Sequence, residues 1–473
     1  MTASAQPKIT VYIPCRHYGR YLRQAIESVL KQTLPDWELV VVDDGSEDET
    51  ARVAGHFREK HPERIRVIRH APARGLPFSA NTALEAARGE YILRLDADDF
   101  LDENALLVLS SYLDRHPEVA LVYPNFIYVD EAGSYLNVEQ RKRVGEEAKL
   151  LDLPAHGAGT MARKRVLKSL GGYDESYGAQ DGYELWLKVL PRHGIANVAT
   201  PLFFYRQHGA SQSRDQNRLL EARRQIKQAM MDSRNGRAGL RIAAIVQAKN
   251  TYAHLPNVVL REMAGSRLID YTLEAALRAE LFEKILVTTD DPEVVRHCRG
   301  VQGISAMLRS SGLSGERTSE NQVALDATTY LERELGSRPD ILVLLSVHAP
   351  LRTAAHIREA VNTLILYGAD SVVSVCEDVD LHFVHGPHGL APLNPAMHRQ
   401  IRLEREGLYE SNGAVRALWR RILAEQDLSG TQVGHIVMAR QDSFQIKTPF
   451  DLQLIEYLLQ QRAEAREKAV PSR

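Results

Sequence analysis

Three carboxylates crowd together where an apolar stretch of the chain ends. Residues 91–95 read Tyr-Ile-Leu-Arg-Leu, and Asp96, Asp98 and Asp99 follow directly. Like charges this close repel one another unless a cation lies between them. Hard oxygen ligands suit Mg²⁺ or Mn²⁺, and such an ion also binds the oxygens of a diphosphate. The spacing therefore predicts a metal centre at Asp96 and Asp98, with a solvated acidic turn as the alternative.

The elements that position these carboxylates alternate regularly. Apolar runs at 9–14 and 39–42 are each followed by a helical pattern, which is typical of a doubly wound parallel α/β sheet. Such sheets bind ligands at the carboxyl edge of their strands. Asp43 and Asp44 end the second run, so we expect them at this same edge, facing a base or ribose. Arg74 precedes the next helical pattern, where it either reaches a nucleotide or lies on the surface.

With these elements in place, residues 8 to about 214 resemble a family 2 glycosyltransferase with the GT-A fold. The resemblance rests on the order and spacing of five motifs, at 11–14, 25–33, 42–46, 89–92 and 95–99. It implies that Asp43 or Asp44 contacts the nucleoside of a nucleotide-sugar donor, beside Pro14. It also implies that Asp96 lies near the ribose or diphosphate and that Asp98 is the principal ligand of Mg²⁺ or Mn²⁺.

A later acidic segment resembles the acceptor site of this family. It reads Gln180-Asp181-Gly182-Tyr183-Glu184, where a glycine interrupts the family's usual acidic pattern. The resemblance implies a base at the start of a helix, so Asp181 is the predicted base and Glu184 the alternative. Such a carboxylate takes the proton of the acceptor hydroxyl while the hydroxyl oxygen attacks the anomeric carbon. The configuration at that carbon is then inverted. Helix N-capping is the ordinary structural role of an aspartate at this position.

The two ends of this region carry one more candidate and one departure from the family. Tyr205-Arg206-Gln207-His208 resembles the family's late loop, in which the histidine approaches the metal or diphosphate. A lone histidine is usually structural, but its place at the end of the fold favours His208 as a second metal ligand. After the first proline, the usual Thr-Tyr-Asn is replaced by Cys-Arg-His-Tyr at 15–18. The motif therefore does not predict which base is bound.

A second α/β domain is predicted after a polar linker. Residues 216–231 carry a charged helical pattern and 232–239 a glycine-containing polar stretch, so we divide the chain into 1–214, a helix and linker at 215–239, and 240–473. Strand and helix patterns then alternate again. They lie at 242–247, 268–279, 284–289, from 319, 341–345 and from 355.

This second domain resembles the cytidylyltransferases that activate eight- and nine-carbon acidic sugars, across 240 to about 462. The matching segments are 268–276, 287–291, 349–352, 368–375 and 412–414. The loop at 248–256 lacks the family's two glycines and its later lysine, while Lys249 stands in for the family's arginine, so the loop would not cradle a triphosphate. Gln445 and Lys447 stand where the family has metal carboxylates, and 346–349 also departs from the family's polar run. We therefore predict a catalytically silent relative.

The balance of charged residues and the cysteine content of the chain argue against some classes of function. Lys plus Arg number 59 and Asp plus Glu 61, so no general attraction to nucleic acid or anionic membrane is expected. The three cysteines lie far apart, and neither a signal peptide nor an apolar run of membrane-spanning length is present. The sequence predicts a soluble, cytoplasmic protein whose partners are small molecules or protein.

The leading hypothesis is a metal-dependent, inverting transferase that uses a nucleotide sugar and a glycan or protein acceptor, with a bacterial surface glycan or glycoprotein as product. The second domain would then serve dimerisation or docking, with a homodimer through a segment near 376–412 as is common among the proteins it resembles. Binding of a nucleotide or sugar without reaction is the alternative role for this domain. A bifunctional enzyme that also activates an acidic sugar with CTP is the first alternative. A non-catalytic sugar-binding scaffold is the second, and the carboxylates at 96, 98 and 181 argue against it.

Overall fold

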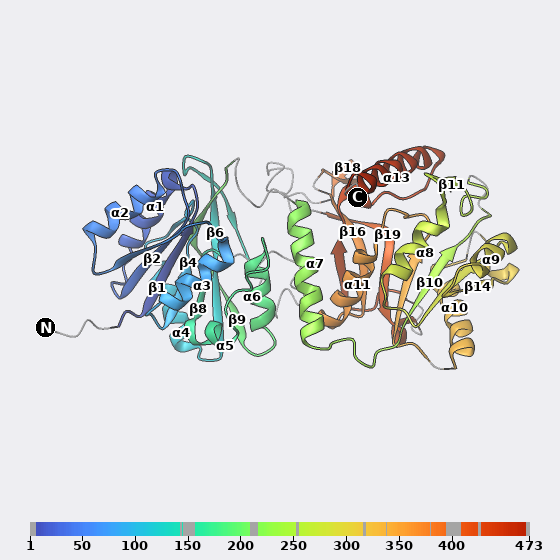
Figure 1. Cartoon of the computed structure of the whole chain (residues 1–473), viewed down its shortest axis with the longest axis horizontal. Helices are drawn as coiled ribbons and strands as arrows, with labels where there is room; N and C mark the ends of the chain where they lie inside the picture. Colours follow the sequence, from blue (N-terminus) through green and yellow to red (C-terminus); the bar gives the residue numbers. More distant parts are fainter. Residues whose placement is uncertain are drawn as a thin grey trace. The chain divides into compact units, whose positions relative to one another are not determined.

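The structure is a computed structural model of the whole chain (Figure 1). It describes residues 6–141, 144, 157–208, 216–251, 255–315, 318–336, 338–378, 380–393, 408–423 and 427–469. The chain divides into two compact units, Met1–Ile226 and Lys227–Arg473. This division falls within α7 (Gln216–Ser233).

In the first unit the described strands form one sheet, in the order β3-β2-β1-β4-β8-β6-β9-β5, with β7 paired to β6. The strands are β1 (Ile9–Cys15), β2 (Trp37–Asp44), β3 (Ile65–His70), β4 (Tyr91–Arg94), β5 (Phe100–Leu101), β6 (Val119–Val129), β7 (Tyr135–Glu139), β8 (Met161–Arg163) and β9 (Gly194–Arg206). The first four are parallel, as the sequence predicts. β8 runs antiparallel to β4 and β6, so the rest of the sheet is mixed.

Helices pack against both the parallel and the mixed part of this sheet, which explains why β1 and β2 are buried throughout. The helices of this unit are α1 (Gly19–Leu30), α2 (Thr50–Lys60), α3 (Leu76–Ala86), α4 (Ala105–Arg115), α5 (Lys164–Ser169) and α6 (Asp181–Val189). Apolar side chains of α1, α2 and α4 share one core with Val11, Ile13, Leu39 and Val41. Figure 1 shows α3 near β1 and β2, which it contacts.

The carboxyl ends of β1, β2 and β4 meet at one edge of this sheet. Cys15 pairs with Asp43, and Tyr12 pairs with Arg94 at the end of β4. The acidic residues that end β2 and follow β4 therefore lie at the same edge, as expected from the sequence.

The second unit has its own sheet, in the order β14-β13-β10-β15-β19-β16-β20. Its strands are β10 (Ile242–Ala248), β13 (Lys284–Thr289), β14 (Ile304–Leu308), β15 (Ile341–Ser346), β16 (Ser371–Asp378), β19 (Leu408–Trp419) and β20 (Val433–Val437), with short hairpins β11 (Glu262–Met263)–β12 (Ser266–Arg267) and β17 (Phe383–Gly386)–β18 (Gly389–Pro392). β19 runs antiparallel to both neighbours, whereas the pairs among β10, β13, β14 and β15 are parallel.

The helices of the second unit complete its α/β architecture. They are α8 (Leu268–Arg278), α9 (Pro292–Arg299), α10 (Glu320–Leu335), α11 (Ala354–Tyr367), α12 (Arg420–Leu423) and α13 (Pro449–Ala469). α8 and β13 lie within a residue of their expected bounds. Among the described residues of the whole chain, no helix combines the length and the apolar character needed to cross a bilayer.

Candidate active site

A tight turn after β4 holds the acidic cluster together. The backbone N–H of Asp99 donates to the carbonyl of Asp96 at 3.1 Å. Arg206, at the end of β9, donates from its backbone N–H to Asp99 Oδ1 at 2.9 Å and from Nε to the Asp98 carbonyl at 2.8 Å. Burial and the charges of Asp98 and Asp96 raise the pKa of Asp99 well above its usual value. The turn therefore carries several close negative charges and is bonded to the end of β9 through Arg206.

Asp98 faces His208, as a shared metal site would require. His208 Nε2 lies 2.8 Å from Asp98 Oδ2, and the His208 side chain is only 1% exposed. Burial and Asp96 raise the pKa of Asp98, although the hydrogen bond with His208 opposes this rise. The ring of Tyr18 flanks the histidine, with 5.9 Å between ring centroids.

These two side chains fit a divalent ion that is also held by substrate. Adjacent ligands of an octahedral ion with bonds of about 2.1 Å lie roughly 3 Å apart, close to the separation of Asp98 and His208. A cation would also relieve the repulsion between Asp96 and Asp98. In the described part of the chain, no group of three His, Cys, Asp or Glu side chains forms a closed metal site. Mg²⁺ is commonly held by one or two carboxylates together with phosphate oxygens.

Asp43 and Asp44 occupy the neighbouring strand end but have different surroundings. Asp44 accepts hydrogen bonds from the backbone N–H groups of Arg74 and Gly75, both at 2.8 Å, and lies 2.9 Å from His70 Nδ1. Burial acts to raise the pKa of Asp44, but these hydrogen bonds outweigh it and lower the pKa. Asp44 therefore fixes the loop that precedes α3.

The two oxygens of Asp43 have different partners. Its Oδ1 accepts the backbone N–H of Ser46 at 2.9 Å. Its Oδ2 is buried, lies 3.3 Å from Arg69 Nε in an ion pair and accepts no hydrogen bond from the described residues. Pro14 lies beside it in β1, buried and paired with Val42. Arg74 is exposed, and its guanidinium lies 3.3 Å from the centre of the Phe78 ring.

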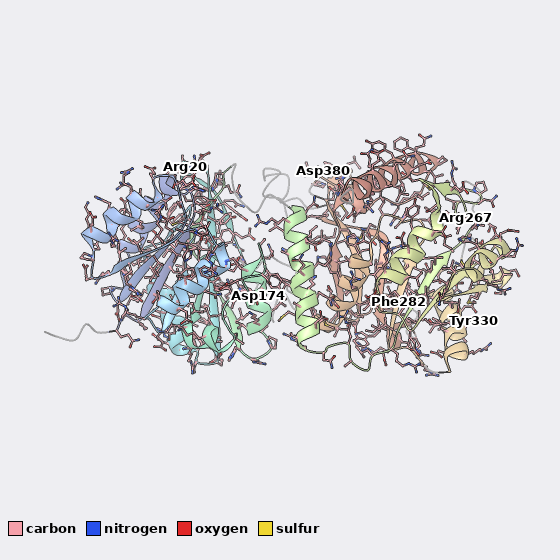
Figure 2. The ribbon with its side chains drawn as sticks, viewed as in Figure 1. Arg20, Asp174, Arg267, Phe282, Tyr330 and Asp380 are labelled. Carbon is pink, nitrogen blue, oxygen red and sulfur yellow. The ribbon has the colours of Figure 1, made fainter. Side chains whose placement is uncertain are left out.

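Asp181 is the first residue of α6 and belongs to the same site. Its Oδ2 accepts a hydrogen bond from Arg94 Nη1 at 2.5 Å. The N-cap residue is Gln180, and no side-chain capping hydrogen bond is present at this helix start. The loop before α6 is braced by Asp174, labelled in Figure 2, whose Oδ1 accepts the hydroxyl of Ser176 at 2.6 Å.

Glu184, one turn further along α6, is held elsewhere. It forms an ion pair with Lys188, and its Oε2 is buried without a hydrogen bond to the described residues. Burial raises the pKa of Glu184 despite this partner. Lys188 Nζ also donates to the Gly172 carbonyl at 3.0 Å, so this pair fastens α6 to the preceding loop. Glu184 is therefore tied to Lys188, whereas Asp181 is tied through Arg94 to Asp96.

Two arginines of this site, Arg94 and Arg206, are not predicted as site residues from the sequence. Arg94 lies in an apolar strand and is only 8% exposed, and Arg206 is 2% exposed. Charged side chains are almost never fully buried without partners. A charged residue inside an apolar run is therefore the available signal, but it does not identify the partner.

The corresponding edge of the second unit is occupied by its own side chains. The backbone N–H of Asn250 donates to Asp290 Oδ1 at 2.7 Å, and Asn250 Nδ2 donates to Asp291 Oδ2 at 2.6 Å. Asn250 Oδ1 accepts the N–H of Val259 at 2.9 Å. The loop after β10 is thus tied to the end of β13 without a ligand; residues 252–254 of this loop lie outside the described residues.

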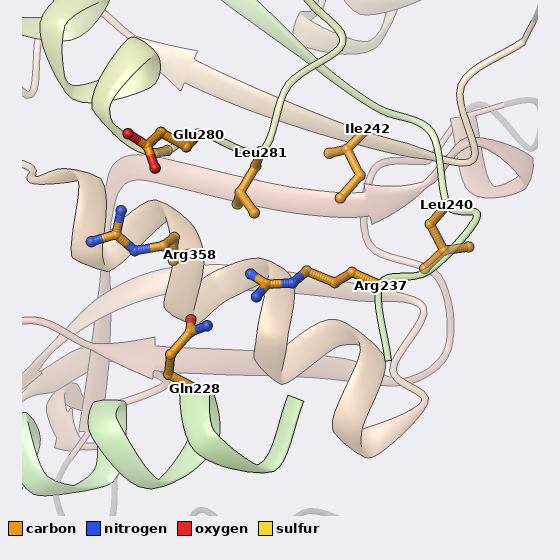
Figure 3. Close-up of a pocket in the computed structure, with 8 residues that line it drawn as sticks. Gln228, Arg237, Leu240, Ile242, Glu280, Leu281 and Arg358 are labelled. Carbon is orange, nitrogen blue, oxygen red and sulfur yellow. The ribbon is translucent and has the colours of Figure 1, made fainter. Parts of the chain in front are cut away.

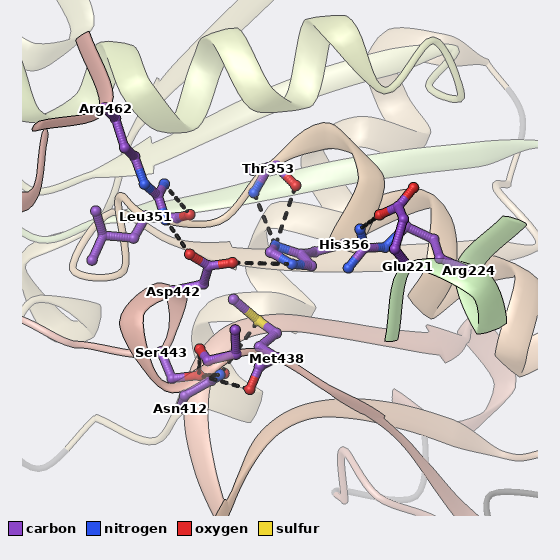
Figure 4. Close-up of polar contacts among 11 residues, drawn as sticks. Glu221, Arg224, Leu351, Thr353, His356, Asn412, Met438, Asp442, Ser443 and Arg462 are labelled. Carbon is purple, nitrogen blue, oxygen red and sulfur yellow. Dashed lines mark hydrogen bonds and ion pairs between the residues drawn. The ribbon is translucent and has the colours of Figure 1, made fainter. Parts of the chain in front are cut away.

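Gln445 and Lys447, which stand where the cytidylyltransferase family has metal carboxylates, also lie close to other side chains or backbone of this unit. A Cβ on Gly413 would lie 2.6 Å from Gln445 Nε2, so the Gln445 amide packs directly on this glycine. Lys447 Nζ lies 3.8 Å from Glu410, and both side chains are exposed. Asn412 donates to Ser443 Oγ at 3.0 Å within the network of Figure 4.

A pocket of about 490 Å³ in the second unit lies away from this edge (Figure 3). It is lined by Gln228, Arg237, Leu240, Ile242, Ala279, Glu280, Leu281 and Arg358. Ile242 begins β10 and Leu281 precedes β13, so the pocket lies at the amino ends of these parallel strands. Open α/β sheets bind ligands at the opposite, carboxyl edge.

Comparison with known families separates the two units. Residues 10–171 match the model of glycosyl transferase family 2, and residues 243–378 match the cytidylyltransferase model. Chondroitin synthase of Escherichia coli is 29% identical over 188 residues, which are 40% of this chain and 27% of that protein. The glucosyltransferase WfgD of Escherichia coli is 26% identical over 46% of this chain and 83% of that protein.

This chain matches the first three curated relatives over only part of their length. This chain spans 27%, 46% and 22% of the first three curated relatives that it matches. Among solved structures, S. aureus TarS residues 1–349 in complex with UDP is 21% identical, with a TM-score of 0.40 over 48% of this chain and 66% of that one. By its family matches, the first half of this chain is similar to the family 2 glycosyl transferases and the second half to the cytidylyltransferases.

Proposed function

We propose that this protein is a metal-dependent, inverting glycosyltransferase that moves a sugar from a nucleotide-sugar donor to a hydroxyl of a glycan or protein. One observation carries the proposal. A single sheet edge gathers the buried oxygen of Asp43, the pair of Asp98 and His208, and Asp181 linked to Asp96 through Arg94. These groups correspond to a nucleoside contact, a metal site and a base.

Asp98 and His208 would hold Mg²⁺ or Mn²⁺, which neutralises charge on the departing diphosphate when bound. Asp181 accepts the proton of the acceptor hydroxyl while the acceptor oxygen forms its bond to the anomeric carbon. The bond from that carbon to the diphosphate breaks on the opposite side, so the configuration inverts. The nucleoside diphosphate leaves with the bonding electrons.

The environment of Asp43 favours a base that presents an N–H group. A buried carboxylate oxygen without a hydrogen bond is costly until a donor reaches it. The uracil ring presents such a group at N3, and cytosine presents one at its N4 amino group. We propose a UDP-sugar as the donor because the relative WfgD is named as a UDP-Glc-dependent glucosyltransferase. Pro14 and Arg74 would border this donor, and Asp96 would lie near its ribose or diphosphate.

The second unit is proposed to be catalytically silent and to hold two copies of the chain together. The ligand edge around Asn250 is satisfied internally, and Lys447 would repel a metal ion. The β17–β18 hairpin exposes Phe383 at 46%, Val384 at 45% and Leu390 at 69%. Apolar side chains gathered on a surface mark interaction sites. We keep 1–214, 215–239 and 240–473 as the proposed functional division.

A cytoplasmic location belongs to the same proposal. Cys15, Cys298 and Cys376 are all free thiols, as expected in a reducing compartment. The bifunctional alternative rests on the family match at 243–378. Release of pyrophosphate from CTP in the presence of an acidic sugar would establish that alternative.

The proposal is tested at Asp98. Asp98→Ala should abolish Mn²⁺-dependent release of UDP from a panel of UDP-sugars, because the variant loses its principal metal ligand. A thermal-shift screen of UDP, GDP and CMP with Mn²⁺ should give the largest increase in melting temperature for UDP with the unaltered chain. Undiminished turnover by the folded variant would remove the metal assignment, and stabilisation by CMP alone would remove the donor assignment.

A further inference from the structure

One buried guanidinium joins two carboxylates of the proposed site, Asp96 on the donor side and the proposed base Asp181. Arg94 Nε and Nη2 donate to Asp96 Oδ1 and Oδ2 at 2.6 and 3.1 Å. Nη1 of the same side chain donates to Asp181 Oδ2 at 2.5 Å. The Arg94 side chain is 8% exposed, and those of Asp181 and Asp96 are 10% and 27% exposed.

The shape of arginine is essential to this link. A guanidinium is planar and rigid, so one edge can grip a carboxylate through two N–H groups while the remaining nitrogen donates elsewhere. An ammonium group presents a single point of charge and cannot hold both carboxylates in fixed directions. Arg94 ends β4, and Asp181 begins α6. The link therefore joins a strand end to a helix start.

A glycine leaves room for this arrangement. A Cβ on Gly157 would lie 2.5 Å from Arg94 Nη1, the atom that donates to Asp181. The adjacent backbone is fixed as well, since the N–H of Gly159 donates to the Arg94 carbonyl at 2.9 Å. An alanine at 157 would therefore displace the guanidinium from Asp181 without removing any charge.

We propose that Arg94 is a positioning residue that fixes the base Asp181 relative to the donor loop at Asp96. This inference rests on the proposed function, since it assigns no contact between Arg94 and substrate. Misplacing a reacting group by about 1 Å can cost roughly 100-fold in rate. Loss of Arg94 should therefore act on turnover much more than on nucleotide binding.

The test compares kcat with nucleotide affinity in the full chain. The probes are UDP release from UDP-sugars with Mn²⁺, and calorimetric titration with UDP and Mn²⁺. Arg94→Ala should lower kcat by about 100-fold while the Kd for UDP changes by less than about fivefold. Gly157→Ala should show the same split to a smaller extent. Arg94→Lys should remain impaired despite its positive charge.

Guanidinium rescue separates positioning from folding. Guanidinium chloride, well below denaturing concentrations, should restore part of kcat to Arg94→Ala and none to Asp181→Ala. Arg163, another buried arginine, donates to backbone carbonyls of Leu113 and Val119 and provides a matched control. Arg163→Lys should lower the melting temperature and leave both kcat and Kd near their original values.

The outcomes are distinct. If Arg94→Ala turns over within about threefold of the unaltered chain, or if Asp181→Ala is rescued equally, the positioning role is wrong. If Arg94→Ala does not fold, Gly157→Ala and Arg94→Lys decide the question by the same split. If the unaltered chain neither binds UDP with Mn²⁺ nor releases UDP from any UDP-sugar, the proposed function fails and the inference falls with it.

Discussion

Identical neighbouring side chains take different roles because the donors around them differ. Asp44 accepts hydrogen bonds from two backbone N–H groups and contacts His70, whereas the adjacent Asp43 has a buried oxygen that is ion-paired with Arg69. Asp98 faces a histidine, whereas Asp99 accepts the backbone N–H of Arg206. The proposed roles of Asp43 and Asp98 rest on these different partners.

A buried carboxylate at the opposite end of β2 has a purely structural role that pH can reveal. Glu38 accepts hydrogen bonds from Thr10 Oγ1 and from the N–H and Nε of Arg88, each at 2.7 Å. Burial acts to raise the pKa of Glu38, but these hydrogen bonds and the charge of Arg66 outweigh it and lower the pKa. Ionised Glu38 therefore stabilises the fold above its unfolded pKa of about 4.3, and this contribution is lost as pH falls toward the folded value.

Glu38→Gln should cost about 2 kcal/mol of unfolding free energy at pH 7 and much less at pH 3. Urea unfolding at both values measures the difference. Glu63→Gln, at an exposed position, should have little effect at either pH. A Glu38→Gln deficit that is equal at pH 3 and pH 7 would contradict this account.

At the scale of elements, close backbone contacts hold the site-bearing strands in place. β4 is parallel to β1, and Gly89 lies just before β4 against the backbone of β1. A Cβ on Gly89 would lie 2.5 Å from the Thr10 nitrogen and 2.7 Å from the Ile9 carbonyl carbon. Since these are backbone atoms of a buried strand, they cannot move aside cheaply.

Gly89→Ala should therefore destabilise the first unit by about 2 kcal/mol, a typical cost of overpacking. Gly55, within α2, is the matched control because a Cβ there would meet nothing within 4 Å. Gly55→Ala should instead stabilise by roughly 0.5–1 kcal/mol, because alanine favours a helix interior. Thermal and urea unfolding measure both changes, and equal effects of the two substitutions would contradict the proposed contact.

The sequence predicts those parts of the site that depend on local pattern. Asp43 and Asp96 could be placed at one edge because apolar runs end just before them and parallel strands share their carboxyl edge. The antiparallel β8 and the mixed half of the sheet could not be predicted from the sequence, because strand pairing there depends on contacts between residues distant in sequence. The same applies to Arg94, whose partner Asp181 lies 87 residues away.

At the scale of the whole molecule, the chain combines the proposed donor site of the first unit with a second unit in which, among the described residues, Asn250 is bonded to Asp290 and Asp291 at the corresponding edge. α7 contributes to this organisation, because Lys227 within it is buried and lies 3.2 Å from Glu359 and 3.1 Å from Thr363 of α11. The second half of α7 is thereby fastened to the second unit. The proposed structural role for that unit would account for its retained core.

Self-association through the β17–β18 hairpin is the prediction at this scale. Replacing both Phe383 and Leu390 by Glu should convert a dimer to a monomer in light scattering after size exclusion, because buried charge opposes an apolar interface. Donor turnover by the first unit should persist. Phe450→Glu, at an apolar residue of α13 that is 70% exposed, should leave the mass unchanged. A monomeric unaltered chain would exclude the proposed dimer.

The ties of Arg206 also bear on the order in which the protein forms during synthesis. The backbone N–H of Arg206 and the carboxylate of Asp99 that accepts it are 107 residues apart, with Asp99 made first. Domains fold as units as the chain emerges from the ribosome. Until β9 has been synthesised, the acidic turn has neither Arg206 nor His208 beside it. The proposed metal site is therefore completed only after most of the first unit has left the ribosome, so a nascent chain stalled before residue 206 should lack it.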